Sequence, residues 1–524
     1  MSKPRENWGS KIGIVLAVAG SAVGLGNFLR FPSEVVQNGG GAFMIPYFIA
    51  FLFLGIPIAF AEWTLGRYGG QYGRGSAPGV FDVVARKWWA KYLGIFGLFV
   101  PLVINFFYLV IESWCLAYSA FSLLGYYSPI TNPADMKDLL TEFQGLAPAK
   151  QLPDLPWLYI FFFVTFGVNY WIVSRGIVSG IERLNKICMP LLFLLAGFLF
   201  VRVLTLGTPN PSLPDQNVAN GLGFMWNPDF SALLNVDVWM AAAGQIFSTL
   251  SVGMGAILAY SSYLKKDDDV AHSALSSATT NEFAEVILAG TIIIPATFIF
   301  LGAVGAKEVA QSGSFNLGFV TMPLIFNQLP LGSVFGFMWF FLLTLAGITS
   351  SVSLIQPILT FMQDELHISR VRATIIIGAL TLLVGFVLIQ TIALGTIDEF
   401  NFWGGTFLPV VSALVMVWIF SWIFGAKEGW EELNRSSHIK IPRLFVSVIK
   451  YIKPLYLLVM LSLWVWKNVP IITMSAIADP KVWHTTIWTR IWLLLLIAIL
   501  ILAIYYAGRD YATSKPTSGK GNES

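Results

Sequence analysis

Two apolar stretches of the chain each contain a cluster of glycines and small polar residues. The first has the run GSAVGLGN at 20–27, and the second has GQIFSTLSVGMG at 244–255. Glycine weakens a helix, and an interrupted helix exposes backbone carbonyl and N–H groups. Carbonyl, hydroxyl and amide oxygens coordinate hard cations, whereas the N–H groups that begin a helix attract a carboxylate. The two clusters could therefore bind a small cation and a molecule that carries a carboxylate.

Close helix packing is the alternative interpretation of either cluster alone. Gly20 and Gly24 form a GxxxG pair, which is the spacing that brings membrane helices into contact. The correspondence between the clusters favours a binding site, because the first cluster opens one group of five predicted helices and the second opens the next group. An odd number of helices gives the two groups opposite orientations, and interrupted helices at matching places are typical of inverted-repeat transporters.

The composition predicts a membrane protein with many spans. Of the 524 residues, 56% are hydrophobic and 12% are charged, and the mean hydropathy is +0.70. These values exclude a soluble enzyme, a disordered protein and a secreted disulfide scaffold. Cys115 and Cys188 lie in apolar stretches, and the four histidines lack the spacing of metal ligands. We find no nucleophile–base pair and no nucleotide loop, and the net charge of +3 lies in short loops. We therefore expect neither an enzyme nor a nucleic-acid partner.

Twelve membrane spans are expected, since a bilayer-crossing helix needs about 20 apolar residues. Stretches without Asp, Glu, Lys or Arg run over 12–29, 35–61, 92–111, 155–174, 187–201, 238–264, 286–306, 309–363, 373–397, 400–426 and 491–508. The stretch 309–363 holds one span, at 332–360, after a long uncharged loop, and a twelfth span lies near 454–478, interrupted by Lys467. We therefore expect an all-α polytopic protein with twelve transmembrane helices and a 5+5 inverted repeat in which helices 1 and 6 are broken.

Basic residues orient the loops. Loops 67–91 and 427–453 are rich in Lys and Arg, whereas loops 125–156 and 303–331 are not, and basic loops stay inside. An even number of spans then puts both termini in the cytoplasm, and we expect a multi-pass protein of the cell inner (plasma) membrane without a cleaved signal. The expected divisions are a cytoplasmic segment 1–11, a first repeat 12–203, an extracellular loop 204–235, a second repeat 236–426, a cytoplasmic loop with helices 11 and 12 at 427–509, and a disordered tail 510–524.

Further motifs accompany the two clusters along nearly the whole chain. They are Trp8, GLGNFLRFP at 24–32, NGGGAF at 38–43, EW at 62–63 with GRY at 66–68, GQIF at 244–247, SSY at 261–263, NE at 281–282 with Glu285, FNLGF at 315–319 and AGITSS at 346–351. In this order the motifs resemble the neurotransmitter:sodium symporter family. The resemblance implies the same twelve-helix inverted repeat and Na⁺-coupled uptake of a small amino acid by alternating access.

The resemblance also implies where the ligands bind. One Na⁺ would contact Ala22, Asn27, Thr249, Asn281 and the substrate carboxylate, and a second would contact Gly20, Val23, Ala346, Thr349 and Ser350. The substrate site would comprise Ser21, Ala22, Leu25, Gly26, Ile104, Tyr108, Phe247, Ser248, Thr249, Ser251, Met254, Ser350 and Leu354. A polar residue that only packs helices is the alternative for Asn27 or Thr349 taken singly. Family members that carry monoamines have an acidic residue where this chain has Gly24, so we expect an α-amino acid.

Two departures enlarge the expected side-chain pocket. Leucine-carrying bacterial members of the family have phenylalanine at the positions of Ser248 and Met254, while Ile104 and Leu354 keep the pocket apolar. A serine and a flexible methionine leave more adaptable space. We therefore expect neutral amino acids with large apolar side chains, aromatic ones included. The alternative is that neighbouring side chains refill the space and leucine-sized substrates persist.

Glu285 lies four residues after Asn281, and so on the same helix face. An ionisable residue inside a membrane is functional by default. In chloride-dependent members of the family an anion supplies negative charge near the first Na⁺, and in chloride-independent ones a carboxylate at this position does. We therefore expect no chloride requirement. A carboxyl group that only hydrogen-bonds neighbouring helices is the alternative.

Gates are implied on both sides of the site. The outer gate would be Arg30 with Phe247 as an aromatic lid, and the usual aspartate position holds Asn401, with Asp398 one turn earlier. The inner gate would be the ion pair of Arg5 and Asp364 beside Trp8 and Tyr263, for which a solvated surface pair is the alternative. The expected partners are an amino acid, Na⁺ ions, the lipid bilayer and a second copy in a homodimer. A channel or sensor on the same scaffold is the competing function.

Overall fold

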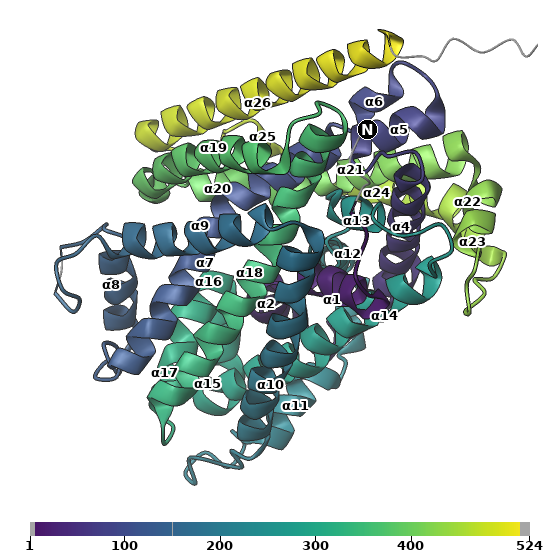
Figure 1. Ribbon diagram of the computed structural model, residues 1–524. Coiled ribbons are helices and arrows are strands. Elements are labelled where there is room, and N and C mark those ends of the chain that lie inside the picture. Colours follow the sequence, from purple (N-terminus) through teal and green to yellow (C-terminus); the bar gives the residue numbers. More distant parts are fainter. Residues whose placement is uncertain (1–5, 149, 514–524) are drawn as a thin grey trace, which may run out of the picture.

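The computed structural model describes residues 6–148 and 150–513, with side chains described as far as 507. Within them the chain is almost entirely helical (Figure 1). Ten helices are long and apolar enough to span a membrane, and the bent pair α1 (Lys11–Ala22) and α2 (Leu25–Gln37) makes an eleventh span, with 48° between its halves. The discontinuous pair α12 (Val236–Thr249) and α13 (Ala256–Ser261) is the twelfth. The expected count is confirmed.

The other members of the first group follow in chain order. Span 2 comprises α3 (Gly41–Ala50), the π-helix η1 (Phe51–Gly55) and α4 (Ile56–Gly70); span 3 is α7 (Phe96–Leu124); span 4 is α9 (Trp157–Ser174); span 5 comprises η2 (Ile177–Glu182) and α10 (Arg183–Leu204). The connections include α5 (Ala77–Ala85), α6 (Ala90–Leu93), α8 (Pro133–Phe143), α11 (Val218–Trp226) and η3 (Phe230–Leu234). The expected extracellular loop 204–235 therefore has helical parts.

The second group continues after span 6 and is followed by the last two spans. Span 7 comprises α14 (Val270–Glu282), η4 (Phe283–Gly290) and α15 (Thr291–Gln311); span 8 is α18 (Gly332–Asp364); span 9 is α19 (Arg370–Gln390), followed by η6 (Ile392–Leu394). Span 10 comprises α20 (Thr396–Phe400), η7 (Asn401–Phe407), α21 (Leu408–Trp418), η8 (Ile419–Gly425) and α22 (Ala426–Leu433). Span 11 comprises α23 (Leu444–Ser447), η9 (Val448–Ile452) and α24 (Lys453–Lys467), and α25 (Val469–Ile472) leads to span 12, α26 (Pro480–Thr513).

The loop expected before span 8 is largely helical, and this expectation is corrected. It contains α16 (Ser314–Asn316), the π-helix η5 (Leu317–Thr321) and α17 (Met322–Asn327). Gly313, with φ of 105°, precedes α16, and Pro323 lies in the first turn of α17. Glycine before a helix and proline in its first turn are favourable positions, so these residues delimit helices here instead of preventing them.

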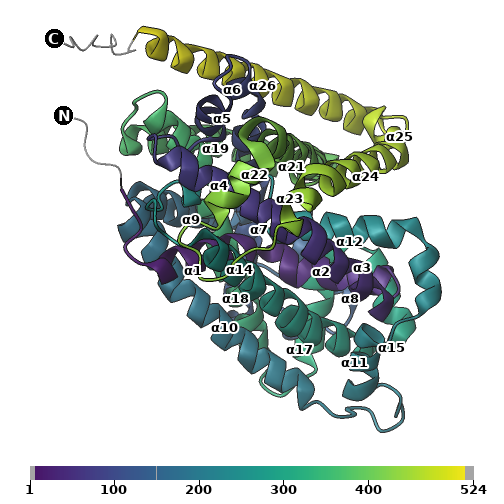
Figure 2. The same cartoon turned by 90° about the vertical axis from the view of Figure 1, so that its right-hand side faces the viewer.

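The broken helices lie at the centre of the molecule. Both ribbon views place α1 and α2 in the middle and α26 along one edge (Figures 1 and 2). Helix α26 ends at Thr513, inside the expected tail, and 514–524 lie outside the described residues. A central position surrounds the breaks with other helices, so freed backbone groups lie in protein, as a membrane requires.

Candidate functional site

The two breaks leave the helical conformation for identifiable reasons. The first falls at Val23 and Gly24, and α2 restarts at Leu25. The second contains Ser251, Gly253 and Gly255 with φ of 52°, 79° and 75°, a region that favours glycine. A Cβ on Gly253 would lie 2.5 Å from the carbonyl oxygen of Pro409, so this position excludes other side chains on space as well.

A buried carboxyl group braces the second break from span 2. The backbone N–H of Gly253 donates to Oε1 of Glu62 at 2.5 Å, and Glu62 is fully buried. Ser251 Oγ donates to the carbonyl oxygen of Ser21 at 3.0 Å, which joins one break directly to the other. The breaks are thus held as one unit.

A cavity of about 400 Å³ lies between the breaks. Its wall includes eleven of the thirteen expected substrate residues, namely Ser21, Ala22, Leu25, Gly26, Ile104, Tyr108, Ser248, Ser251, Met254, Ser350 and Leu354. The cavity continues past Arg30 and Asp398 to Ser314 and Phe315 in the helical connection before span 8. We call this end, which is expected to face outward, the outer end.

Two expected substrate residues, Phe247 and Thr249, do not line this cavity. Thr249 is buried in a cluster described below. Phe247 lines a separate pocket behind α12, so the expected aromatic lid is corrected. A helix turns about 100° per residue, and here Ser248, one position later, faces the cavity. A small hydroxyl therefore occupies the place expected for a ring.

A carboxylate could bind where α2 begins. The N–H of Leu25 donates to the hydroxyl of Tyr108 at 3.0 Å. A Cβ on Gly24 would lie 2.8 Å from the Tyr108 hydroxyl oxygen and 2.9 Å from Ser350 Oγ, so no larger residue fits without movement. Helix N-termini favour anions, and here the hydroxyl of Tyr108 adds a donor. The absence of an acidic residue at Gly24 keeps the place open for the ligand's own carboxylate.

The first expected ion site is a connected cluster of three buried side chains. Nδ2 of Asn27 donates to Oδ1 of Asn281 at 2.9 Å and to Oγ1 of Thr249 at 3.1 Å. Nδ2 of Asn281 donates to the same Thr249 oxygen at 2.8 Å. These side chains come from α2, α14 and α12 and are at most 1% exposed. Amide and hydroxyl oxygens suit a hard cation such as Na⁺, so the donor set fits.

Glu285, expected to share a helix face with Asn281, lies against this cluster. Its carboxylate accepts hydrogen bonds from Thr249 Oγ1, from Gln245 Nε2 and, at 2.9 Å, from the hydroxyl of Tyr47. The side chain is fully buried. Sequence reasoning assigned no role to Gln245 or Tyr47. The spacing of Gln245 four residues before Thr249 could have indicated a shared helix face, whereas Tyr47 approaches from span 2 and gave no local signal.

The second expected ion site lies where α18 meets the end of α1. Ser350 Oγ donates to the carbonyl oxygens of Gly20 and Ser21, each at 3.3 Å. Thr349 Oγ1 donates to the carbonyl oxygens of Leu345 and Ala346 at 3.0 and 3.1 Å. Val23, also expected here, follows directly at the break, and its N–H donates to Ala19 at 2.7 Å. Ser350 thus joins α18 to the carbonyls at the end of α1, and carbonyl and hydroxyl oxygens are a donor set that also fits Na⁺.

Gly20 shows that the packing alternative holds in part. A Cβ on Gly20 would lie 2.0 Å from Oδ1 of Asn185 on α10. A glycine is therefore required for helix contact at this position, whatever its carbonyl binds. One residue can serve both purposes, because packing uses the Cα side and coordination uses the carbonyl.

The outer gate differs from the expectation. Arg30 Nη1 donates to Ser248 Oγ at 2.5 Å, and Arg30 Nε lies 3.4 Å from Oε1 of Glu34 one turn later. Asn401 and Asp398 both line the cavity, but among the described residues Arg30 hydrogen-bonds Ser248 and Glu34. The serine that replaces the ring thus receives the guanidinium.

The expected inner gate has more contacts between helices than the outer gate. Trp8 Nε1 donates to the carbonyl oxygen of Tyr260 at 2.9 Å, and its ring meets the Tyr260 ring edge-on at 5.4 Å. The hydroxyl of Tyr263 lies 3.2 Å from Thr360 Oγ1 and accepts from Gln356 Nε2 at 3.1 Å. Trp8 and Tyr263 thus make contacts within and between spans 6 and 8 and the N-terminal segment, while Arg5, and with it the expected pair with Asp364, lies outside the described residues.

Two carboxylates that the sequence analysis missed hold the N-terminal segment against span 5. Glu182 accepts the N–H of Gly9 at 2.7 Å and the hydroxyl of Ser10 at 2.8 Å. Glu6 accepts the N–H of Ile177 at 3.0 Å. Nothing in the local sequence pairs residues about 170 positions apart, so the fold was needed to find them.

Comparison with known proteins identifies the family of the chain. The chain matches the Sodium:neurotransmitter symporter family over residues 5–129 and 148–510. An uncharacterized sodium-dependent transporter of Methanocaldococcus jannaschii is 31% identical over 440 residues, which cover 83% of this chain and 86% of the relative. The sodium- and chloride-dependent glycine transporter 1 of Xenopus laevis is 26% identical over 499 residues, covering 86% and 76%.

A solved structure gives the same fold. The crystal structure of MhsT in complex with L-phenylalanine superposes with a TM-score of 0.74 and 31% identity, covering 87% of this chain and 99% of that one. The relatives are sodium-dependent transporters, and the enzyme alternative has no support among them. With its broken helices, central cavity and flanking oxygen clusters, the chain belongs to the sodium:neurotransmitter symporter family and is a sodium-dependent membrane transporter.

Proposed function

We propose that this protein is a chloride-independent symporter that couples two Na⁺ ions to uptake of neutral amino acids with large apolar side chains. The observation that carries the proposal is one cavity bounded by both helix breaks, with an oxygen cluster on each side. The proposal includes a location in the plasma membrane with both termini cytoplasmic, alternating access, and a homodimer as a candidate assembly.

The size of the substrate is argued from the cavity wall. Ile104, Met254 and Leu354 are apolar, and Ser248 leaves open the space that a ring would fill. MhsT, 31% identical, was crystallised with L-phenylalanine. An aromatic side chain contributes much binding energy when its whole surface is buried. The proposed site is therefore best filled by phenylalanine- or tryptophan-sized side chains.

The coupling of Na⁺ to the substrate follows from the short distance between the proposed carboxylate position and the first ion cluster. The substrate carboxylate, placed at the Leu25 N–H and the Tyr108 hydroxyl, lies on the same break as Asn27. An ion held by Asn27, Thr249 and Asn281 would therefore be attracted to the substrate, and each would strengthen the binding of the other, because such coupling is reciprocal. Substrate affinity should fall when Na⁺ is withdrawn.

Chloride independence is argued from Glu285. Its buried carboxylate directly contacts Thr249, a member of the first ion cluster, and so supplies negative charge there. Replacing Glu285 by serine would remove that charge and leave a space beside Gln245 and Tyr47, whose polar hydrogens favour an anion. We expect the variant Glu285→Ser to transport only when chloride is present.

The test measures uptake and binding with chloride or gluconate. Wild type should bind radiolabelled tryptophan and leucine in Na⁺ but not in K⁺, equally with either anion, whereas Glu285→Ser should need chloride. Glu112→Gln is the control, because Glu112 is an equally buried carboxyl that hydrogen-bonds Asn169 at 2.8 Å, away from the cluster. Equal transport by Glu285→Ser in both anions would refute the chloride role, and preference for alanine or glycine would refute the proposed substrate class.

A further inference from the structure

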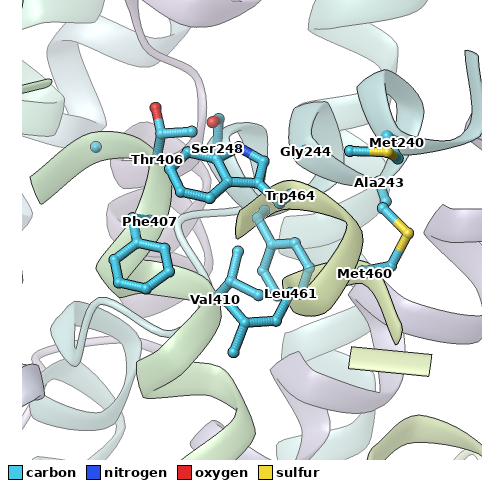
Figure 3. A pocket seen from close by; sticks show the side chains of 12 residues that line it. Met240, Ala243, Gly244, Ser248, Thr406, Phe407, Val410, Met460, Leu461 and Trp464 are labelled. Carbon is cyan, nitrogen blue, oxygen red and sulfur yellow. The ribbon is translucent and has the colours of Figure 1, made fainter. Parts of the chain in front are cut away.

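A second, smaller pocket of about 40 Å³ lies behind α12, between η7, α21 and α24 (Figure 3). We call it the side pocket. Its far wall is apolar and consists of Phe247, Phe407, Val410, Met460, Leu461 and Trp464. The rings of Phe407 and Trp464 stack with centroids 5.1 Å apart, so part of the wall is a fixed aromatic surface. No charged residue lines the pocket.

The side pocket adjoins the central cavity. Ser248, Gly405 and Thr406 line both spaces. All three are small, and Gly405 has no side chain. A ring at position 248 would add bulk to this common wall. These three small residues therefore form the wall between the side pocket and the central cavity, and their size determines whether a side chain can pass.

The volume and the apolar lining of the side pocket determine which chemical group it can hold. About 40 Å³ exceeds the 10–15 Å³ that a water requires, but it is far too small for a whole amino acid. An apolar pocket without charged groups also suits no zwitterion, because an unpaired charge is costly to bury. The occupant that fits has its charged end elsewhere and an apolar tip at the pocket.

We propose that the side pocket receives the distal end of the substrate's side chain, and that Ser248 is the specificity-determining residue that admits it. This inference rests on the proposed function, and it adds that span 11, through Met460, Leu461 and Trp464, takes part in substrate selection. The wall of Ser248, Gly405 and Thr406 that the side pocket shares with the central cavity favours the substrate over an acyl chain from the bilayer, which would not need this common wall.

A substitution in the far wall of the side pocket tests the inference, because a substrate confined to the central cavity would not contact that wall. Leu461 lines the side pocket but not the central cavity. Leu461→Phe should fill the pocket and weaken binding of tryptophan about tenfold or more, with less than a twofold change for valine, since burial of a few methylene equivalents is worth this much. Leu463→Phe on the same helix is the matched control, because Leu463 is 38% exposed and outside the pocket.

A second variant closes the same passage from the cavity side. Ser248→Phe should lower the ratio of tryptophan to valine affinity as Leu461→Phe does, and the double variant should be no worse than the stronger single one, because both block one route. Additive losses, equal weakening of both amino acids by Leu461→Phe, or unchanged tryptophan affinity would overturn the inference. Unchanged affinity would leave the pocket to an acyl chain. Lack of Na⁺-dependent binding of any amino acid by wild type would instead refute the proposed function.

Discussion

The two ends of the substrate pathway differ in how firmly they are held. On the inner side, Trp8 contacts Tyr260 through a hydrogen bond and a ring contact, and Glu6 and Glu182 attach the N-terminal segment to span 5. On the outer side, the central cavity continues past Arg30, which donates a hydrogen bond to Ser248 and lies 3.4 Å from the carboxylate of Glu34 on its own helix.

The difference indicates which state is stable without substrate. Several independent contacts hold the inner side, whereas one hydrogen bond to Ser248 joins α2 to α12 at the position of Arg30. Each contact contributes about 1 kcal/mol, and those with a charged group about 1.5–3 kcal/mol. With the proposed orientation, this balance favours the state that is open to the outside, which suits the proposed uptake driven by external Na⁺. Alternating access then requires the substrate to strengthen the outer contacts.

The largest expected effect comes from Trp8→Ala. It removes the hydrogen bond to Tyr260, worth about 1 kcal/mol, and the ring contact with Tyr260, worth about 0.5–1.5 kcal/mol. The inner side should open, so Na⁺-dependent substrate binding should weaken tenfold or more, and amide hydrogen exchange over 256–263 should accelerate. Trp488→Ala is the control, because Trp488 is 69% exposed. Unchanged exchange over 256–263 would show that another contact closes the inner side.

Glu182→Gln should have an intermediate effect. The carboxylate accepts from Gly9 and Ser10 and pairs with Lys186 at 2.7 Å, and an amide retains only part of these interactions. A loss of about 1 kcal/mol corresponds to about a fivefold shift in equilibrium. Exchange of the amides over 9–13 should accelerate by that factor. The exposed pair of Lys427 and Glu431, 4.0 Å apart, supplies the control Glu431→Gln, which should change nothing.

The helices and their breaks could be predicted because their signals are local. Apolar length defines a span, and glycines at Gly253 and Gly255 mark backbone that needs positive φ. The polar residues of the ion clusters, such as Asn27, followed from the resemblance of the motifs, because each residue taken singly could equally be a polar residue that packs helices. Much of the candidate site could thus be found without the fold.

The parts of the site that could not be predicted depend on helix phase or on contacts between residues distant in the sequence. Both Phe247 and Ser248 were expected to line the substrate site, but each helical step rotates the side chain by about 100°, so Ser248 faces the central cavity and Phe247 does not. The roles of Tyr47 and Glu182 depend on helices that meet only in the folded chain, so no periodicity could reveal them. The partner of Arg30 was missed for both reasons, because it depends on which residue of α12 faces the cavity and on the contact between α2 and α12.

The smallest effect is expected from Asn401→Asp, which would strengthen the contacts of Arg30 at the outer end of the central cavity. Asn401 lines the outer cavity with Arg30, so a carboxylate there adds a charged partner for the guanidinium. Exposed ion pairs contribute about 0–1 kcal/mol, so dissociation of bound radiolabelled substrate should slow about two- to threefold. The slowing should shrink as choline chloride is added at constant Na⁺, because salt screens exposed charges.

The variant Arg30→Gln separates this ion pair from a general effect of the new charge. Slowing that depends on the pair should vanish in Arg30→Gln/Asn401→Asp, and slowing that persists there would contradict the pairing. If the double variant behaves as Arg30→Gln alone, the open outer end follows from the neutral residue at position 401. The chain then resists closure on the outer side because of one missing charge, while the inner side is held by contacts distributed over the N-terminal segment and spans 5 and 6.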